Sequence, residues 1–254
     1  MLVFDIGNSD VVIALNSNSE WKNLSRIPSD DCQDINFFNS RLTEIRNENG
    51  LQGKIESIVI SSVVPKLTQL LPDEIERVLS VKPFVITADN YSAIDMEIDN
   101  PHEIGSDLVA NALAAHASLG RTQVVVVDLG TALTFTIVSE NGTLLGVAIA
   151  PGIKTAMKSL AGNTALLPEI PLELPGSVIG KNTVHAMQAG IMHGSAGMVE
   201  GILNTIRKEV GECKVIATGG MAEVMKPLHP LFDSIEPNLT LEGIKLIYDS
   251  GMKE

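Results

Sequence analysis

The sequence predicts an α/β protein made of two related lobes, each with a sheet covered on both faces. Residues 1–9 (MLVFDIGNS) and 124–132 (VVVVDLGTA) form a weak internal repeat. In each copy an apolar run is followed by Asp-x-Gly and then by a small hydroxyl or amide residue. The apolar runs do not alternate with polar residues, which is typical of strands buried on both faces. Segments with a helical pattern separate the strands, so the fold class is α/β.

Each copy of the repeat is expected to form a β-hairpin. A second apolar stretch follows each Asp-x-Gly turn, at 11–15 (VVIAL) and at 134–138 (TFTIV). Asp and Gly tolerate the unusual backbone angles of such a tight turn. Further strands are predicted at 57–62, 83–87 and 214–218.

Two helices are predicted from their patterns and their first residues. Residues 105–119 begin with Ser106 and Asp107, which are residue types preferred at a helix N-terminus. Residues 183–209 form a longer helical pattern that contains four glycines, each of which weakens a helix by about 1 kcal/mol relative to alanine. We therefore expect another backbone to approach this helix closely, at a lobe or subunit interface. The glycines are Gly190, Gly194, Gly197 and Gly201.

The division into lobes is expected near residue 116. This gives an N-terminal lobe of residues 1–115 and a C-terminal lobe of residues 116–254. The proline-rich segment 162–178 is predicted to be an irregular connection within the second lobe.

The composition narrows the possible partners. Of the 254 residues, 31 are acidic and 18 are basic, which gives a formal net charge of −13. A surface this negative repels nucleic acid backbones and anionic membranes, so neither is expected as a partner. Two distant cysteines, Cys32 and Cys213, are too few for a disulfide framework. With no signal peptide and no apolar run of membrane-spanning length, the sequence predicts a cytoplasmic protein.

The two Asp-x-Gly turns could bind phosphate. Gly7 and Gly130 would let backbone N–H groups approach a phosphate closely, and Asn8, Ser9 and Thr131 could donate further hydrogen bonds. A single turn of this kind is more often an ordinary hairpin. Two copies at matching positions favour a shared function.

Acidic and glycine residues nearby complete a nucleotide-binding pattern. The carboxylates of Asp5 and Asp128 could hold Mg²⁺, directly or through water, or another cation. Gly219 and Gly220 follow a predicted strand and could admit a flat adenine ring. This pattern resembles the actin, hexokinase and Hsp70 superfamily, which implies two ribonuclease-H-like lobes with the ATP cleft between them.

Seven motifs extend the resemblance over almost the whole chain. They are DIGNS at 5–9, SSVVP at 61–65, NPHEIGSD at 100–107, DLGTALTF at 128–135, APGI at 150–153, GKNTVHAMQAGI at 180–191 and ATGG at 217–220. Together they resemble the type III pantothenate kinases. The resemblance implies a cytoplasmic homodimer that phosphorylates the 4′-hydroxyl of pantothenate with ATP, the first step toward coenzyme A.

The resemblance also implies roles for individual residues. It makes Asp107 the catalytic base and Asp128 the ligand of a monovalent cation (K⁺ or NH₄⁺). That leaves Asp5 to hold Mg²⁺, directly or through water. Pantothenate would contact Gly105, Ser106, Asp107 and Leu108, and Thr183 would reach it from the second subunit. With the adenine turn included, the residues expected to contact ATP are Asp5, Ile6, Gly7, Asn8, Ser9, Asp10, Val11, Val12, Gly130, Thr131, Gly219 and Gly220.

The chemistry of phosphoryl transfer agrees with a catalytic role for Asp107. The reaction needs a carboxylate that takes the proton of an acceptor hydroxyl aligned with the γ-phosphate. From the residues alone, Asp107 is explained equally well as a helix cap. The resemblance favours catalysis.

The segment expected to bind pantothenate, the phosphoryl acceptor, departs from the family pattern at two positions. Leu108 stands where the family has arginine, and Ile98 where it has tyrosine. A lost charged hydrogen bond costs about 1.5–3 kcal/mol. Three interpretations stay open: a cation such as Lys154, Lys158 or Lys181 replaces the arginine, the pocket takes a less anionic hydroxyl compound, or the chain is an inactive nucleotide-binding or regulatory homologue.

Overall fold

The chain folds into two compact units. The computed structural model describes residues 1–252. One unit consists of Met1–Ala114 together with a C-terminal segment that begins at Asn238, and the other is Ala115–Pro237. Among the described residues, no helix combines the length and the apolar character needed to cross a membrane.

The first unit contains a mixed five-stranded sheet. Its strand order is β3-β2-β1-β4-β5, with β1, β2 and β3 antiparallel and with β1, β4 and β5 parallel. Continuous burial of Leu2, Val3 and Phe4 explains why the first apolar run forms a central strand. The strands are β1 (Leu2–Ile6), β2 (Asp10–Ser17), β3 (Glu20–Pro28), β4 (Ile58–Ser62) and β5 (Pro83–Val85).

Helices α1 and α2 cover the hydrophobic core of this sheet. Phe38 and Leu42 of α1 and Leu71 of α2 are fully buried against the strands. Helix α3 follows β5, and the boundary between the units falls within it. The helices are α1 (Ile35–Glu48), α2 (Pro65–Leu79), α3 (Ser106–Leu119) and α6 (Leu239–Gly251), with 3₁₀ segments η1 (Asp31–Gln33), η2 (Ala88–Ala93) and η3 (Pro101–Glu103).

The second unit repeats the topology of the first. Its order β8-β7-β6-β9-β10 has the same antiparallel and parallel pairs as β3-β2-β1-β4-β5. This repetition confirms the duplicated, ribonuclease-H-like α/β fold that the sequence repeat predicts. The strands are β6 (Val124–Leu129), β7 (Ala132–Val138), β8 (Leu144–Pro151), β9 (Lys214–Thr218) and β10 (Ser234–Ile235).

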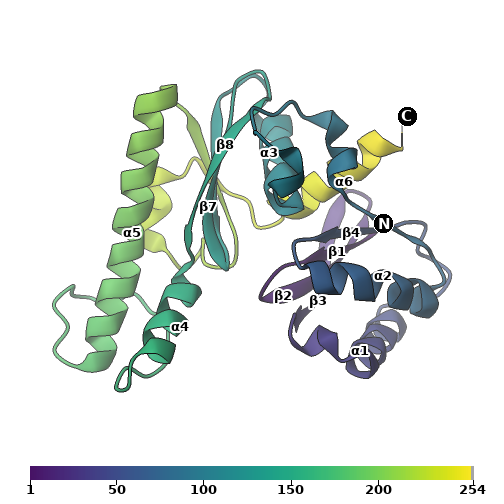
Figure 1. The fold of residues 1–254 in the computed structure, drawn as a ribbon, viewed down its shortest axis with the longest axis horizontal. Helices are drawn as coiled ribbons and strands as arrows, with labels where there is room; N and C mark the ends of the chain where they lie inside the picture. The colour runs from purple at the N-terminus through teal and green to yellow at the C-terminus, as the bar shows by residue number, and fades with distance from the viewer. Residues whose placement is uncertain (253–254) are drawn as a thin grey trace. The chain divides into compact units, whose positions relative to one another are not determined.

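Helices α4 (Ile153–Asn163) and α5 (Thr183–Val210) cover the second sheet, with η4 (Lys226–Leu231) following β9. The long helix α5 runs beside β7 and β8 (Figure 1). Its residues Met187, Met192 and Leu203 are buried in the core with Phe135 of β7. The connection between α4 and α5 is irregular, as the proline-rich sequence predicts.

The position of the C-terminal segment differs from the predicted division into lobes of residues 1–115 and 116–254, because this segment belongs to the first unit. Helix α6 packs against β1, β4 and η2 of the first unit. Gly243 permits this packing, because a Cβ there would lie 1.9 Å from the carbonyl oxygen of Ala110 in α3. The chain therefore returns to the first unit at Asn238, through a long-range contact with no local signature in the sequence.

Candidate active site

The first Asp-x-Gly turn joins β1 to β2 and is held in place by β3. The N–H of Gly7 donates to the carbonyl of Asp10 at 3.0 Å, and the hydroxyl of Ser29 donates to the carbonyl of Gly7 at 2.6 Å. The N–H of Ser29 donates to the carbonyl of Ser9 at 2.9 Å. Asn8 and Ser9 are exposed at the tip of this fixed turn. Ser29, which the sequence did not single out, thus supports the turn predicted to bind phosphate.

The residues around this turn differ in what they can offer a ligand. Ile6 and Val11 are buried, so they can contribute only backbone groups to a site. The carboxylate of Asp10 pairs with Arg26 at 3.1 Å on the surface. Asp5 is half-buried on β1, opposite the half-buried Val12 of β2.

In the second unit, the carboxylate of Asp128 lies between two glycine turns. A Cβ at Gly219 would lie 2.3 Å from Asp128 Oδ1, and a Cβ at Gly130 would lie 3.2 Å from it. Gly219 also has a φ of +89°, which side chains rarely adopt. The fold therefore brings together Asp128, Gly130 and the turn of Gly219 and the exposed Gly220, which belong to separate sequence motifs.

Gly152 supports the backbone of the second turn. In the sequence this glycine belongs to the APGI motif at 150–153, for which no role was predicted. The N–H of Gly152 donates to the carbonyl of Thr131 at 3.1 Å, and the hydroxyl of Thr155 donates to the same carbonyl. A Cβ at position 152 would lie 2.3 Å from the carbonyl oxygen of Gly130. Gly152 is thus the N-cap of α4 and the support of the turn.

Asp107 lies in the first turn of α3, at the end of the helix where a negative charge is stabilised. The N–H of Leu108 donates to its Oδ1 at 2.8 Å. Burial raises the pKa of the Asp107 carboxyl, and the backbone N–H groups of Leu108 and Asp107 oppose that shift. A carboxylate with a raised pKa is a better general base than an ordinary one.

Gly105 and Tyr91 lie close to the Asp107 carboxylate. A Cβ at Gly105 would lie 2.3 Å from Asp107 Oδ1, so this glycine makes room for the carboxylate. Tyr91 of η2 is 8% exposed, and burial together with the charge of Asp107 raises the pKa of its phenol to about 12. The phenol is therefore neutral at physiological pH. Sequence reasoning missed Tyr91, because nothing local connects η2 with α3.

The side chain at position 108 belongs to the protein interior. Leu108 is 7% exposed, so only its backbone remains to serve the predicted substrate site. Ile98 is half-buried, and the three candidate lysines are exposed. Those lysines are Lys154, Lys158 and Lys181.

Thr183 begins α5 and lines a pocket of the second unit. The pocket has a volume of about 1100 Å³ and lies between α4 and α5. Lys181 and Asn182 also line it, and the side chain of Asn182 caps the helix by accepting the N–H of His185 at 2.9 Å. Of the three candidate lysines, Lys181 is the one in this lining.

The predicted metal ligands, Asp5 and Asp128, do not belong to a cluster of metal-ligating side chains in the described residues. Within residues 1–252, no group of three or more His, Cys, Asp and Glu side chains could hold a metal ion. Asp5 and Asp128 fit a different arrangement, in which one carboxylate and phosphate oxygens share a cation. That arrangement is usual for Mg²⁺ in phosphoryl-transfer sites.

Two duplicated units with these turns define an ATP-binding fold of the actin, hexokinase and Hsp70 class. The chain belongs to the type III pantothenate kinase family, whose model matches residues 1–205. It is 39% identical over 251 residues to "Type III pantothenate kinase" of Moorella thermoacetica, covering 98% of each chain. It is 36% identical to the protein of the same name in Geobacillus kaustophilus, covering 100% of this chain and 99% of the other.

A solved structure supports the fold. The crystal structure of a "conserved putative Baf family transcriptional activator" from Campylobacter jejuni is 20% identical to this chain. It matches with a TM-score of 0.59 over 100% of both chains. At this identity the likeness concerns the fold alone.

Proposed function

We propose that this protein transfers the γ-phosphoryl group of ATP to the 4′-hydroxyl of pantothenate, the first step of coenzyme A biosynthesis. The observation that carries the proposal is Asp107, a largely buried carboxylate with a raised pKa at the N-terminus of α3. Membership of the type III pantothenate kinase family supports the choice of substrate. The proposed setting is the cytoplasm, in which the free thiols of Cys32 and Cys213 stay reduced.

Each Asp-x-Gly turn binds phosphate oxygens in this proposal. In the first unit, the backbone of Gly7 to Val12 and the side chains of Asn8 and Ser9 donate to phosphate oxygens. Gly130 and Thr131 do the same in the second unit, and the open turn at Gly219 and Gly220 receives the adenine. Mg²⁺ at Asp5 and K⁺ or NH₄⁺ at Asp128 supply positive charge that offsets the charge of the phosphates.

Asp107 acts on the acceptor. Its carboxylate takes the proton of the 4′-hydroxyl as the oxygen attacks the γ-phosphorus, and ADP leaves. The backbone of Gly105 to Leu108 lines the place of the acceptor. The Leu108 side chain is apolar and buried, so the carboxylate of pantothenate needs another partner. We assign that role to Lys181 of the partner subunit, since Lys181 lines the same pocket of its own chain as Thr183.

The proposal is tested by measuring ADP release from ATP and Mg²⁺, with K⁺ or NH₄⁺, in the presence and absence of pantothenate. We expect pantothenate-dependent ADP release, and mass spectrometry should identify 4′-phosphopantothenate. Folded protein that binds ATP and forms no product would refute the proposal. It would favour a different hydroxyl acceptor or a nucleotide-binding protein without catalysis.

We further propose that the functional unit is a homodimer formed through α5. At Gly190, Gly194, Gly197 and Gly201, a Cβ would have no neighbour within 4 Å, leaving aside the helix's own nearby backbone. The glycines therefore do not serve packing within the chain. They leave a flat strip along a long helix, which suits the close approach of a second copy.

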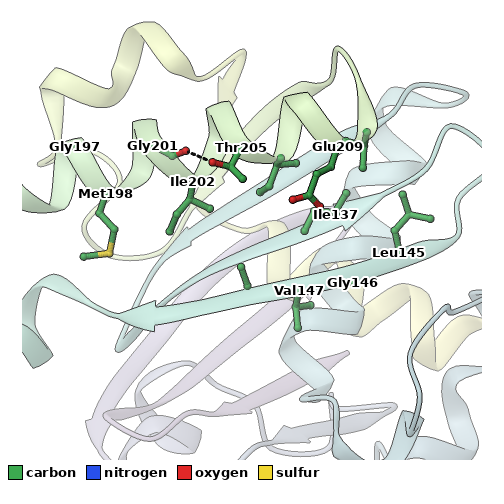
Figure 2. A pocket seen from close by; sticks show the side chains of 13 residues that line it. Ile137, Leu145, Gly146, Val147, Gly197, Met198, Gly201, Ile202, Thr205 and Glu209 are labelled. Carbon is green, nitrogen blue, oxygen red and sulfur yellow. Dashed lines mark hydrogen bonds between the residues drawn. The ribbon is translucent and has the colours of Figure 1, made fainter.

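Two pockets border this glycine strip. Gly190 and Gly194 line the pocket with Thr183, and Gly197 and Gly201 line a second pocket of about 570 Å³ between α5, β7 and β8. Figure 2 shows that Gly146 and Val147 of β8 lie across this second pocket from α5. The strip and its apolar borders form one surface, which supports an interface on which Thr183 of the partner subunit reaches the acceptor.

Replacing Gly194 by leucine should separate the subunits without damaging the fold. A Cβ at position 194 has no neighbour within 4 Å apart from the helix's own nearby backbone, and leucine improves the helix propensity. The added side chain obstructs the close approach of a second copy. We expect a monomer by light scattering, with kcat/KM for pantothenate lowered about tenfold or more because a substrate-positioning group is lost. Leucine at Glu200, which is exposed on α5 and lines neither pocket, is the matched control. A dimeric Gly194→Leu protein would contradict this interface.

A further inference from the structure

The end of β4 connects the first phosphate turn with the helix that carries Asp107. In the parallel pair of β1 and β4, Ser61 lies beside Asp5. Beyond Ser61 the N–H of Val63 donates to the carbonyl of Ile6 at 3.1 Å, so the pairing continues to the start of the turn. Ser61 therefore keeps a fixed position relative to the turn at Gly7.

Ser61 also contacts the first turn of α3. Its hydroxyl lies 2.8 Å from the hydroxyl of Ser106, and these two side chains are 1% and 4% exposed. Two hydroxyls buried this deeply depend on each other, because water cannot replace a lost partner. The hydrogen bond joins β4 to the residue directly before Asp107.

A second contact lies beside this hydrogen bond. A Cβ at Gly105 would lie 3.2 Å from Cγ1 of Val63, so the backbone before α3 approaches the residue that follows β4. The beginning of the helix is thus joined to the end of β4 by one hydrogen bond and lies close to Val63. Ser61 and Val63 belong to the segment that pairs with β1 up to the phosphate turn.

We infer that Ser61 is a positioning residue, which fixes the Asp107 carboxylate relative to the phosphate-binding turn through its hydrogen bond with Ser106. In-line phosphoryl transfer requires the base, the acceptor oxygen and the γ-phosphate to hold one geometry. Ser61 holds the base, Asp107, in place relative to the strand that orients the γ-phosphate. Its effect on turnover rests on the proposed function, whereas its effect on Asp107 does not.

The test compares Ser61→Ala with the double variant Ser61→Ala/Ser106→Ala. The single variant leaves the Ser106 hydroxyl buried without a partner, which lowers stability, and the double variant removes both groups and should recover much of it. If Ser61 positions the base, kcat falls about tenfold to a hundredfold in both variants, with little change in KM for ATP. Ser118→Ala removes a hydroxyl at the other end of α3 and serves as the control.

A second readout follows the Asp107 carboxyl directly by carbon-13 NMR titration. We expect both Ser61 variants to lower the pKa of Asp107 toward its ordinary value, because a displaced first turn admits water to the carboxylate. Burial and the charge of Asp107 raise the pKa of the Tyr91 phenol to about 12, which keeps this phenol out of the titration range of Asp107. The control should titrate like the unmodified protein.

The outcomes separate this inference from the proposed function. If the unmodified protein forms no phosphopantothenate while the pKa of Asp107 still falls in both variants, positioning stands and the proposed function fails. If the pKa of Asp107 is unchanged, or if kcat recovers in the double variant together with stability, the Ser61–Ser106 pair serves only the fold. Either of these two results overturns the inference.

Discussion

Replacing Asp107 by asparagine is expected to lower kcat by about 10²- to 10⁴-fold and to leave the affinity for ATP unchanged. Asparagine has nearly the same shape and can still accept the N–H of Leu108, but it cannot take a proton from the acceptor. The phosphate turns lie on other elements and keep their geometry. Steady-state kinetics together with ATP titration by calorimetry would measure both effects. Unchanged turnover would remove Asp107 from the mechanism.

The same substitution should stabilise the protein at neutral pH. Burial raises the folded-state pKa of Asp107 above its ordinary value of 3.8, so ionisation of this carboxyl opposes folding. The stabilising protonated form is fully present below pH 3.8, and its contribution is lost as the pH rises through the folded-state pKa. Asparagine never ionises, so Tm should exceed that of the unmodified protein at pH 7, with the difference disappearing near pH 3.

A control separates this effect from the general loss of negative charge. Asp73 is exposed on α2, and Asp73→Asn changes the net charge by the same amount. Its Tm should follow that of the unmodified protein at both pH values. A Tm at pH 7 that is no higher in Asp107→Asn than in this control would show that burial does not strain the carboxylate. When a catalytic residue lowers the stability of the fold, its replacement is expected to lower turnover and to raise stability.

The sequence predicts the central strands and the edge strand β5, and it misses the edge strands β3, β8 and β10. β1, β4, β6 and β9 are buried on both faces, so each appears as a continuous apolar run. In β3 most residues are at least partly exposed, and Ile27 is the buried one, so no apolar run marks it. β8 contains an apolar run, LLGVAIA, so the absence of such a run does not explain why this strand is missed. The two residues of β10 are too few to form a pattern.

One part of the candidate site could be predicted from local sequence motifs, and the other part depends on contacts between segments far apart in the sequence. The turns at Gly7 and Gly130 follow from a local motif, and so does the position of Asp107 at a helix N-terminus. The contacts of Ser61, Tyr91 and Gly152 do not, because each joins segments far apart in the sequence. Position 108 is the clearest case. The resemblance placed Leu108 in the substrate site, and the structure buries its side chain and leaves only its backbone for that purpose.

Replacing Gly152 by alanine is expected to weaken ATP binding at least about tenfold and to destabilise the second unit by about 1–3 kcal/mol. The new methyl group would lie 2.3 Å from the carbonyl oxygen of Gly130 and 2.4 Å from that of Thr131. Both are backbone atoms, so the turn or the start of α4 must move. The φ of −67° at Gly152 suits alanine, which makes the steric contact the cause. Calorimetric titration with ATP and thermal unfolding would measure the two effects.

The other end of the same helix supplies the matched control. Gly162 lies in the last turn of α4, and a Cβ there has no neighbour within 4 Å. Gly162→Ala should leave ATP affinity unchanged and stabilise the helix by up to about 1 kcal/mol. Opposite effects of one added methyl group at the two ends of α4 would show that the helix N-terminus supports the phosphate turn. Equal ATP affinity in the two variants would show that the turn holds its shape without Gly152, and Asp128 and Thr131 would then need another source of rigidity.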